Sequence, residues 1–303
     1  MAITEDWAVK HANVEYSNNV TATLRAMPGL HKLAGSTASY SGNSKAKIEN
    51  RFGRLRMREK SARNGDTNNT DISSLTRWIK PRRMGTVAPL VDIEDQVQTE
   101  VELGSPLVKE VAEAAMVYHD DSFVMGLFGN AYEGDGGDTI VPFKSANVVA
   151  HGGTGLTLDK LLAVRELAGL NNARTGREAP ILLLTPKDET DLLQIAEYKN
   201  ADFNESRPLV DGEIKPFMGM RFFSINPDEE SFPDSWENFF ADSGVTRRLP
   251  MFYPRGMHFG SWIPFIGSND ARPDKDMAEQ YWGAAKSAAV RTDEDLVYIV
   301  ETR

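Results

Sequence analysis

The sequence predicts an α+β protein, because extended segments come first, a long helix follows, and strands then alternate with helices. The first observation is the alternation of charged and apolar residues over Arg54-Leu55-Arg56-Met57-Arg58, which has the period of a β-strand. The second is helical spacing of apolar residues within 104–128, where Ser105 and Pro106 suit a helix start. The third is the short apolar run Ile181–Leu184, typical of a buried strand.

Residues 45–90 are predicted to form a long β-hairpin. Asn64-Gly65 provides the turn signal, and the return arm carries Leu75 and Ile79. Because a two-stranded hairpin is marginal alone, it must rest on another surface, and its arginine-rich face requires an acidic one. Its candidate intersubunit contact residues are Arg54, Arg56, Arg58, Trp78, Lys80, Arg82 and Arg83.

Charge is divided unevenly along the chain. Residues 1–86 hold 15 basic and 7 acidic side chains, whereas the remainder holds 19 basic and 37 acidic ones. Such asymmetry indicates an interaction arm, and other copies of the chain offer it an acidic partner. Glu110 and Glu113, on the helix predicted over 104–128, are the candidate partner residues. Nucleic acid is the competing partner, but the strongly negative remainder predicts only weak, salt-sensitive DNA binding confined to residues 1–83.

Composition excludes several classes of protein. The 303 residues suffice for one large domain or two modest ones, and 41% hydrophobic residues allow a core. The absence of cysteine excludes disulfides, thiolate metal sites and a cysteine nucleophile. Neither a run of 18 apolar residues nor a signal peptide is visible, so no membrane partner is expected.

The remaining elements follow in order. Residues 1–44 are predicted to be an extended arm with at most a short helix, and residues 129–155 to be loop or turn. Thr157 is expected to cap a helix over 158–167, and Pro186 to begin the next helix. Residues 276–289 are predicted to be a helix interrupted at Gly283. The remaining strands are expected at 221–225, 251–253, 257–266, where Pro264 limits pairing, and 296–300.

Three acidic or glycine-rich segments could suggest catalysis or metal binding. Glu133-Gly-Asp-Gly-Gly-Asp138 lacks the spacing and the terminal glutamate of a calcium loop. Adjacent residues of Tyr118-His119-Asp120-Asp121 diverge around a helix, so they cannot converge on one metal ion. The segment 151–155 resembles an esterase oxyanion strand, but no Gly-x-Ser-x-Gly nucleophile elbow occurs elsewhere in the chain. It also lacks the lysine of a phosphate-binding loop, so it is interpreted as a glycine turn. No catalytic, cofactor or metal residue is therefore predicted.

An aromatic set in the second half could instead stack on single-stranded nucleic acid. Acidic residues outnumber basic ones around it, which favours a core or a subunit interface. The set comprises Trp236, Phe239, Phe240, Phe252, Tyr253, Phe259, Trp262 and Phe265.

Several phrases, in this order, resemble the major capsid proteins of tailed bacteriophages, which have the HK97-like fold. After the arm and the hairpin, the long helix ends in the segment Tyr118–Gly126, whose sequence is similar to that at the end of the family's spine helix. Leu158–Leu162 resembles the next helix, Pro180–Leu193 the strand–turn–helix after it, and Gly283–Glu301 the closing segment. The resemblance covers nearly the whole chain.

The resemblance implies a structural protein that assembles through hexamers and pentamers into an icosahedral head enclosing double-stranded DNA. An encapsulin-like compartment and a hydrolase are the alternatives. It also implies assembly in the host cytoplasm, a portal protein, a separate scaffolding protein and a possible decoration protein. The implied divisions are an N-terminal arm (1–44), an E-loop hairpin (45–90), a P domain with the spine helix (91–150), an A domain (151–275) and a C-terminal return segment (276–303).

Overall fold

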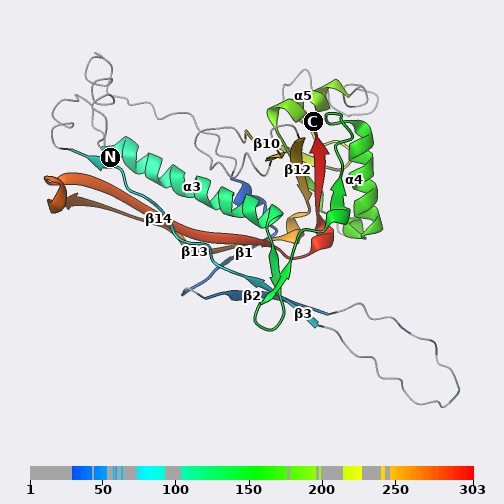
Figure 1. The fold of residues 1–303 in the computed structure, drawn as a ribbon, viewed down its shortest axis with the longest axis horizontal. Coiled ribbons are helices and arrows are strands. Elements are labelled where there is room, and N and C mark those ends of the chain that lie inside the picture. The colour runs from blue at the N-terminus through cyan, green and yellow to red at the C-terminus, as the bar shows by residue number, and fades with distance from the viewer. Residues whose placement is uncertain are drawn as a thin grey trace.

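The computed structural model describes residues 29–42, 44–52, 57, 59, 63, 74–92, 104–175, 178–195, 198, 214–226, 240–242 and 246–303. Helices and three sheets occur together, which confirms the α+β class (Figure 1). Among the described residues no helix has the length and hydrophobicity to cross a bilayer. Short 3₁₀ turns connect the elements: η1 (Leu30–Leu33), η2 (Ser145–Asn147), η3 (Ala173–Thr175), η4 (Pro254–Gly256), η5 (Pro273–Lys275) and η6 (Glu294–Leu296).

The first sheet is built on a long antiparallel hairpin. Helix α3 (Gly104–Phe128) lies along this hairpin, so the helix and two strands share one long axis (Figure 1). The helix begins at Gly104, one residue before the predicted cap. The strands are β1 (Ser36–Ser39), β13 (Met257–Arg272), β14 (Ala278–Arg291), β4 (Gly85–Val87) and β5 (Leu90–Val91).

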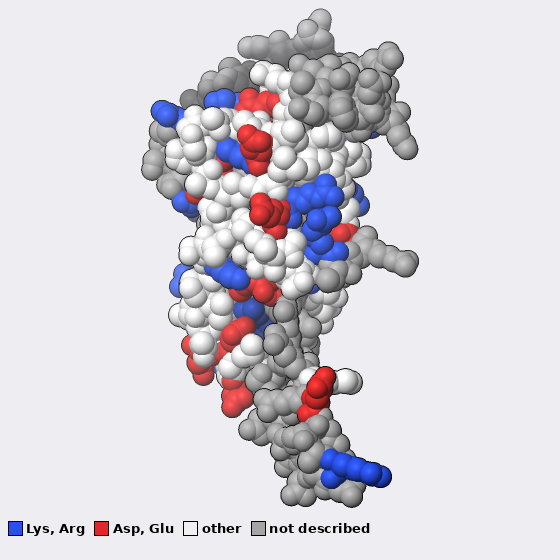
Figure 2. Space-filling view, turned by 90° about the vertical axis from the view of Figure 1, so that its right-hand side faces the viewer, with Lys and Arg blue, Asp and Glu red and all other residues white. Residues whose placement is uncertain are grey.

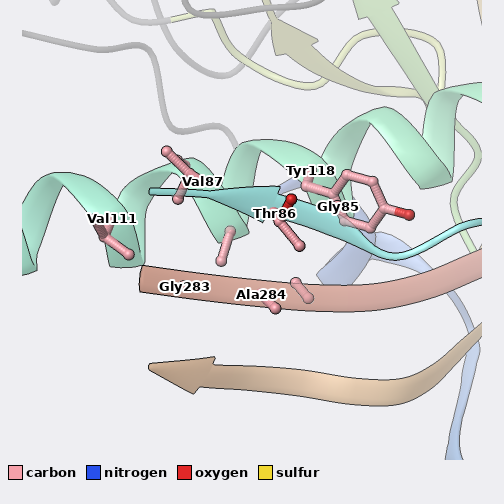
Figure 3. Close-up of a pocket in the computed structure, with 10 residues that line it drawn as sticks. Gly85, Thr86, Val87, Val111, Tyr118, Gly283 and Ala284 are labelled. Carbon is pink, nitrogen blue, oxygen red and sulfur yellow. The ribbon is translucent and has the colours of Figure 1, made fainter. Parts of the chain in front are cut away.

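The prediction of a helix over 276–289 is wrong, because this segment is strand β14. It pairs with β13 over nearly its whole length, with Gly283 opposite Gly267. Its small residues let α3 approach closely: a Cβ on Gly283 would lie 2.3 Å from Val111 Cγ1, and one on Gly126 would lie 2.7 Å from Ala289 Cβ. Figure 3 shows Val111 and Gly283 together in the pocket between α3 and β14. Packing against the helix, rather than helix propensity, explains the alanines and glycines.

The second sheet forms a separate lobe with two helices (Figure 1). The predicted strands at 181–184, 221–225, 251–253 and 296–300 all belong to it, and both helices predicted after 155 are present. Thr185 caps the second of them by accepting a hydrogen bond from the backbone N–H of Asp188. The elements are α4 (Leu158–Leu170), α5 (Pro186–Gln194), β8 (Val148–Val149), β9 (Ile181–Leu184), β10 (Arg221–Ser224), β11 (Ala241–Asp242), β12 (Thr246–Phe252) and β15 (Val297–Thr302).

The third sheet carries the predicted hairpin at the lower end of the molecule (Figure 1). Residues 46–52 and 74–79 pair antiparallel, which confirms the hairpin for these described strands. The end of the predicted range differs, because Gly85–Val87 and Leu90–Val91 pair with β14 of the first sheet. Residues 129–155 were predicted to be loop or turn, but they contain three short strands, because this segment extends two sheets at their edges. The strands of the third sheet are β2 (Ala46–Phe52), β3 (Ser74–Ile79), β6 (Ala131–Glu133) and β7 (Thr139–Val141).

Two further predictions concern strand β13 and the N-terminal arm. Strand β13 continues beyond the predicted end, and its register with β14 shifts between Ser261 and Ile266, around Pro264. That shift is expected because proline has no N–H to donate to the ladder. In the described part of the arm, the short turn η1 precedes strand β1, which agrees with an extended arm containing at most a short helix. Residues 1–28 lie outside the described part of the chain.

Candidate intersubunit contact surface

Trp78 lies at the base of the β2–β3 hairpin and packs against the β6–β7 turn of the same chain. Its indole Nε1 donates a hydrogen bond to the carbonyl oxygen of Gly134, with an N–O distance of 2.6 Å. The ammonium of Lys45 lies 5.7 Å from the centre of the indole ring. At Gly137, where φ is +66°, a Cβ would lie 2.9 Å from Trp78 Cγ. Trp78 therefore fixes the hairpin to the β6–β7 turn of its own chain.

The basic cluster after β3 is also engaged within the chain. Lys80 Nζ lies 3.7 Å from the centre of the Tyr132 ring, a cation–π contact. Arg82 Nη1 donates to Asp121 Oδ2 at 2.7 Å, and the Arg82 guanidinium lies 5.3 Å from the Tyr118 ring centre. Arg83 exposes its side chain, while its carbonyl accepts a hydrogen bond from the Tyr118 hydroxyl.

Tyr118 connects the end of this basic cluster to α3. Its ring lies against Gly85, where a Cβ would come 2.7 Å from Tyr118 Cδ2 (Figure 3). Burial raises the pKa of its hydroxyl more than the charge of Arg82 lowers it. The hydroxyl therefore stays a neutral donor, and α3 is held to the chain that returns from the hairpin.

The other candidate contact residues are placed as follows. Arg54, Arg56 and Arg58 lie outside the described residues, so the predicted arginine row stays a prediction. Glu110 and Glu113 are half-buried on α3. On the face drawn in Figure 2, both acidic and basic side chains lie among uncharged ones.

A buried charged network at the base of the hairpin was not predicted from the sequence. Arg77 is 4% exposed, and its Nη2 lies 3.1 Å from Glu133 Oε1 and its Nη1 3.5 Å from Glu294 Oε1. Arg77 Nε also donates to the carbonyl of Thr292 at 3.2 Å. Arg291 is fully buried and pairs with Glu294 at 2.8 Å. Strand β3 of the hairpin is thereby joined to β6 and to the segment that follows β14.

Arg291 extends the same network to the end of α3. Its Nη1 donates to the carbonyl oxygens of Leu127 and Gly129, the first at 2.8 Å. The last carbonyls of a helix have no partner within the helix, and the helix dipole favours a cation there. Burial raises the pKa of Glu294, and the nearby charges of Arg291 and Arg77 oppose that shift. In the sequence, the three-residue spacing of Arg291 and Glu294 is the only sign of this charged network, and it does not indicate that the pair is buried.

The cluster Tyr118–Asp121 diverges as predicted. His119 Nε2 donates to the Pro264 carbonyl at 2.7 Å, and its Nδ1 accepts from Ser287 Oγ at 2.8 Å. Asp120 instead accepts from the backbone N–H of His31 at 3.0 Å, and Asp121 binds Arg82. Because each side chain contacts a different element, the cluster joins the arm and the sheet to α3.

The remaining candidate segments have structural contacts. Glu133 pairs with Arg77, and Asp138 lies 3.5 Å from Lys45. Gly152 and Gly153 both have positive φ, which confirms a glycine turn. No cluster of potential metal ligands occurs within the described ranges. Of the aromatic set, Trp236 and Phe239 lie outside the described residues and Phe265 is exposed, whereas the buried members are Phe240, Phe252, Tyr253, Phe259 and Trp262.

Comparisons with known proteins agree on one family. A family model described as phage capsid protein matches residues 8–302. No curated protein matches the chain. The fold is similar to the Cyanophage Pam1 capsid asymmetric unit, with a TM-score of 0.70, 12% identity and 96% of each chain covered. It is also similar to the acidic stable capsid structure of Helicobacter pylori bacteriophage KHP30, with a TM-score of 0.71, 10% identity and 96% and 95% of the two chains covered.

A chain of Mycobacterium phage Che8 has a TM-score of 0.68 and 12% identity, with 94% of this chain and 95% of that chain covered. At such low identity these likenesses establish the fold, which is HK97-like. The family model covers nearly the whole sequence, and the hairpin, the long helix α3 and the α4–α5 lobe occur in the expected order. The chain therefore belongs to the phage capsid protein family, and it is a structural subunit of a phage capsid.

Proposed function

We propose that this protein is the major capsid subunit of a tailed phage, and that its copies assemble as hexamers and pentamers into an icosahedral head around double-stranded DNA. The match to the phage capsid protein family over residues 8–302 carries this proposal. Negative-stain microscopy of the purified protein tests it, with closed shells as the expected result. A monodisperse monomer under all assembly conditions contradicts it.

The work of the protein in this proposal is binding between copies, without covalent catalysis. The polar side chains that could suggest catalysis, in Tyr118–Asp121, are engaged in contacts between elements. A hydrolase would release product from ester or phosphoester substrates at rates that depend on these residues. Activity that disappears in a His119→Gln variant, while the variant still folds, would contradict a purely structural role.

We propose the following division of the chain: N-terminal arm 1–44, E-loop hairpin 45–90, P domain 91–150, A domain 151–275 and C-terminal return segment 276–303. The grouping of α4, α5, β9 and β12 in one lobe supports the A domain. Limited proteolysis of unassembled subunits tests the boundaries. Cleavage should begin between 53 and 73, at the proposed hairpin tip, because exposed loop tips are the preferred sites of nicking.

The intersubunit surface in this proposal joins the hairpin of one copy to an acidic surface of the next. Arg54, Arg56 and Arg58 provide the basic row, and Glu110 and Glu113 of α3 are the proposed acidic partner. The side chain of Arg83 is exposed and therefore accessible to a neighbouring copy, which supports this assignment. The side chains of three other candidates make contacts within their own chain: Trp78, Lys80 and Arg82.

Further partners are proposed from the family alone. They are a portal protein, a separate scaffolding protein, a possible decoration protein and packaged DNA, with assembly in the host cytoplasm. Efficient assembly of correct shells from this chain alone would contradict the scaffolding protein. Contact with DNA is proposed to be weak and confined to residues 1–83, so filter binding should fall steeply with added salt. Submicromolar binding that persists in high salt would contradict that.

A further inference from the structure

A pocket of about 370 Å³ lies in the α4–α5 lobe. Arg165 of α4 and Arg174 of η3 line it, together with Glu178. The remaining wall is formed by uncharged side chains and one glycine: Ala179, Pro180, Met218, Gly219, Met220, Met251 and Tyr253. Pockets that bind small molecules have this size and this mixture of apolar walls and few polar groups, with volumes of roughly 300–1,000 Å³.

Two arginines of this pocket have no partner among the residues that the structure describes. Arg165 is half-buried and Arg174 is exposed, and within the described part of the chain neither guanidinium makes a hydrogen bond or an ion pair. The half-buried Arg247 differs, because it binds the carboxylate of Asp188 at 3.0 and 3.1 Å. Holding a half-buried cation without an anion is unfavourable, so Arg165 in particular requires an explanation.

Arg255 adds a third guanidinium beside the pocket. Its carbon Cζ lies 5.8 Å from the Tyr253 ring centre, and its Nη2 donates to the Ala173 carbonyl at 2.6 Å. Its Nε is buried and has no hydrogen-bond partner among the described residues. Among the described residues, Glu178 is the only carboxylate lining the pocket, and it accepts a long hydrogen bond of 3.4 Å from the backbone N–H of Arg255. Within the described ranges, the three guanidinium groups therefore exceed the carboxylates by two charges.

The hydroxyl of Tyr253 lies near the guanidinium groups of Arg165, Arg174 and Arg255. Burial raises the pKa of its hydroxyl, and the charges of Arg174, Arg255 and Arg165 act in the opposite direction. All three guanidinium groups are therefore close enough to the hydroxyl to influence its ionisation. A neutral tyrosine hydroxyl beside them is a further hydrogen-bond donor for an anion.

This excess of positive charge occurs in a protein whose net charge is −10. A phosphate group at neutral pH carries about two negative charges and several acceptor oxygens, and arginine binds such oxygens in a fixed fork geometry. We propose that the pocket binds a small phosphate-bearing molecule, with Arg165 and Arg174 holding the phosphate and Met218 and Met251 contacting an apolar or aromatic body.

Isothermal titration of the purified full-length protein with pyrophosphate and with adenosine monophosphate, at constant ionic strength, tests the proposal. Both probes should bind the wild-type protein at millimolar or lower concentration. Arg174→Gln and Arg165→Gln should each weaken binding about tenfold, because a hydrogen bond to a charged group is lost. Lys187→Gln is the matched control, since it removes one positive charge from an exposed position on α5 of the same lobe.

Three results would overturn the proposal. One is the absence of heat from both probes with the wild-type protein. Another is equal weakening by Lys187→Gln, which would indicate non-specific attraction to the lobe. The third is a lower shell yield of Arg174→Gln without any probe binding to the wild type, which would assign these arginines to a carboxylate of a neighbouring copy. Because Arg174 is exposed, its variant should fold, and unchanged circular dichroism verifies this.

Discussion

The guanidinium of Arg291 donates a hydrogen bond of 2.8 Å to the carbonyl oxygen of Leu127, although the two residues are 164 positions apart. This contact ties the end of the long helix to the end of strand β14. Glu294 binds the same arginine and also faces Arg77 of the hairpin strand β3. The proposed E-loop hairpin, the helix and the closing segment of the chain are therefore connected through one buried side chain.

Arg291→Met should destabilise the subunit by about 3–5 kcal/mol, because breaking a buried ion pair leaves a buried charge and unpaired carbonyls behind. Urea denaturation of the purified subunit measures the change. Arg248→Met is the control, since Arg248 is 34% exposed at its side chain and lies 3.8 Å from Glu301. A partly exposed pair of this kind contributes about 0–1 kcal/mol. Equal losses in the two variants would show that Arg291 has no special role.

Much of this architecture follows from local patterns in the sequence. The short apolar run in β9 and the proline after Thr185 are signals that depend only on neighbouring residues. The divergence of Tyr118 to Asp121 follows from helix geometry alone. These features were predicted because period and capping determine them without reference to distant contacts.

Strand β14 shows why the rest could not be predicted. Ala284, Ala285 and Ala288 favour a helix when considered alone, yet all three are buried in strand β14. Ala285 lines the pocket beside α3, and Ala288 packs in a cluster with Ile79 and Trp262. Pairing with β13 and close approach of a distant helix override that preference. The network of Arg77 and Arg291 escaped prediction for the same reason, because its members converge only in the folded chain.

Gly283→Ala should destabilise the subunit by about 1–3 kcal/mol, since overpacking a tight core forces neighbouring side chains to move. Its new Cβ would lie 2.3 Å from Val111 Cγ1. Gly169→Ala is the control, because its Cβ would meet only Arg174 Cδ, at 4.0 Å. The midpoint of thermal unfolding compares the two variants.

A double variant separates overpacking from a loss of backbone freedom. Val111→Ala removes the methyl group that a Cβ on residue 283 would strike. Combined with Gly283→Ala, it should cost less than the two single changes added together, by about 1 kcal/mol. Strict additivity would show that the contact between Val111 and position 283 does not limit the packing.

His119 should make the subunit less stable in mild acid. Burial lowers its pKa from the ordinary value of 6.5, and nearby His31 acts in the same direction, while the Pro264 carbonyl and Asp120 oppose the shift. The unfolded chain therefore binds a proton at a higher pH than the folded chain does. This contribution to stability is fully present above pH 6.5 and is lost as the pH falls through the lower folded-state pKa.

This dependence is checked by measuring the free energy of unfolding from pH 8 to pH 5 in steps of about one pH unit, because histidine titrates in this range. The wild-type protein should lose more stability over that interval than His119→Gln does. Burial raises the pKa of Glu294, so this group adds stability below its ordinary value of 4.5 and loses it as the pH rises through the raised folded-state pKa. A wild-type profile that runs parallel to the His119→Gln profile would contradict the prediction.

Changing Arg54, Arg56 and Arg58 together to Glu should block or weaken shell assembly while the subunit still folds. Residues two apart on a strand are about 6.5–7 Å apart, so the predicted row of guanidinium groups requires carboxylates opposite to offset its self-repulsion. One exposed ion pair contributes only about 0–1 kcal/mol, but every subunit of a shell repeats the contact. Added salt should mimic the variant in part by screening.

Changing the same three residues to Lys conserves their charge and is the matched control for this experiment. Shell yields, counted by negative-stain microscopy and compared with circular dichroism of the subunits, distinguish two explanations. If charge across the subunit boundary drives docking, the Lys variant should assemble and the Glu variant should not. If the arginines only keep an exposed hairpin soluble, the Glu variant should reach wild-type yields, because carboxylates solubilise a surface as well as guanidinium groups do.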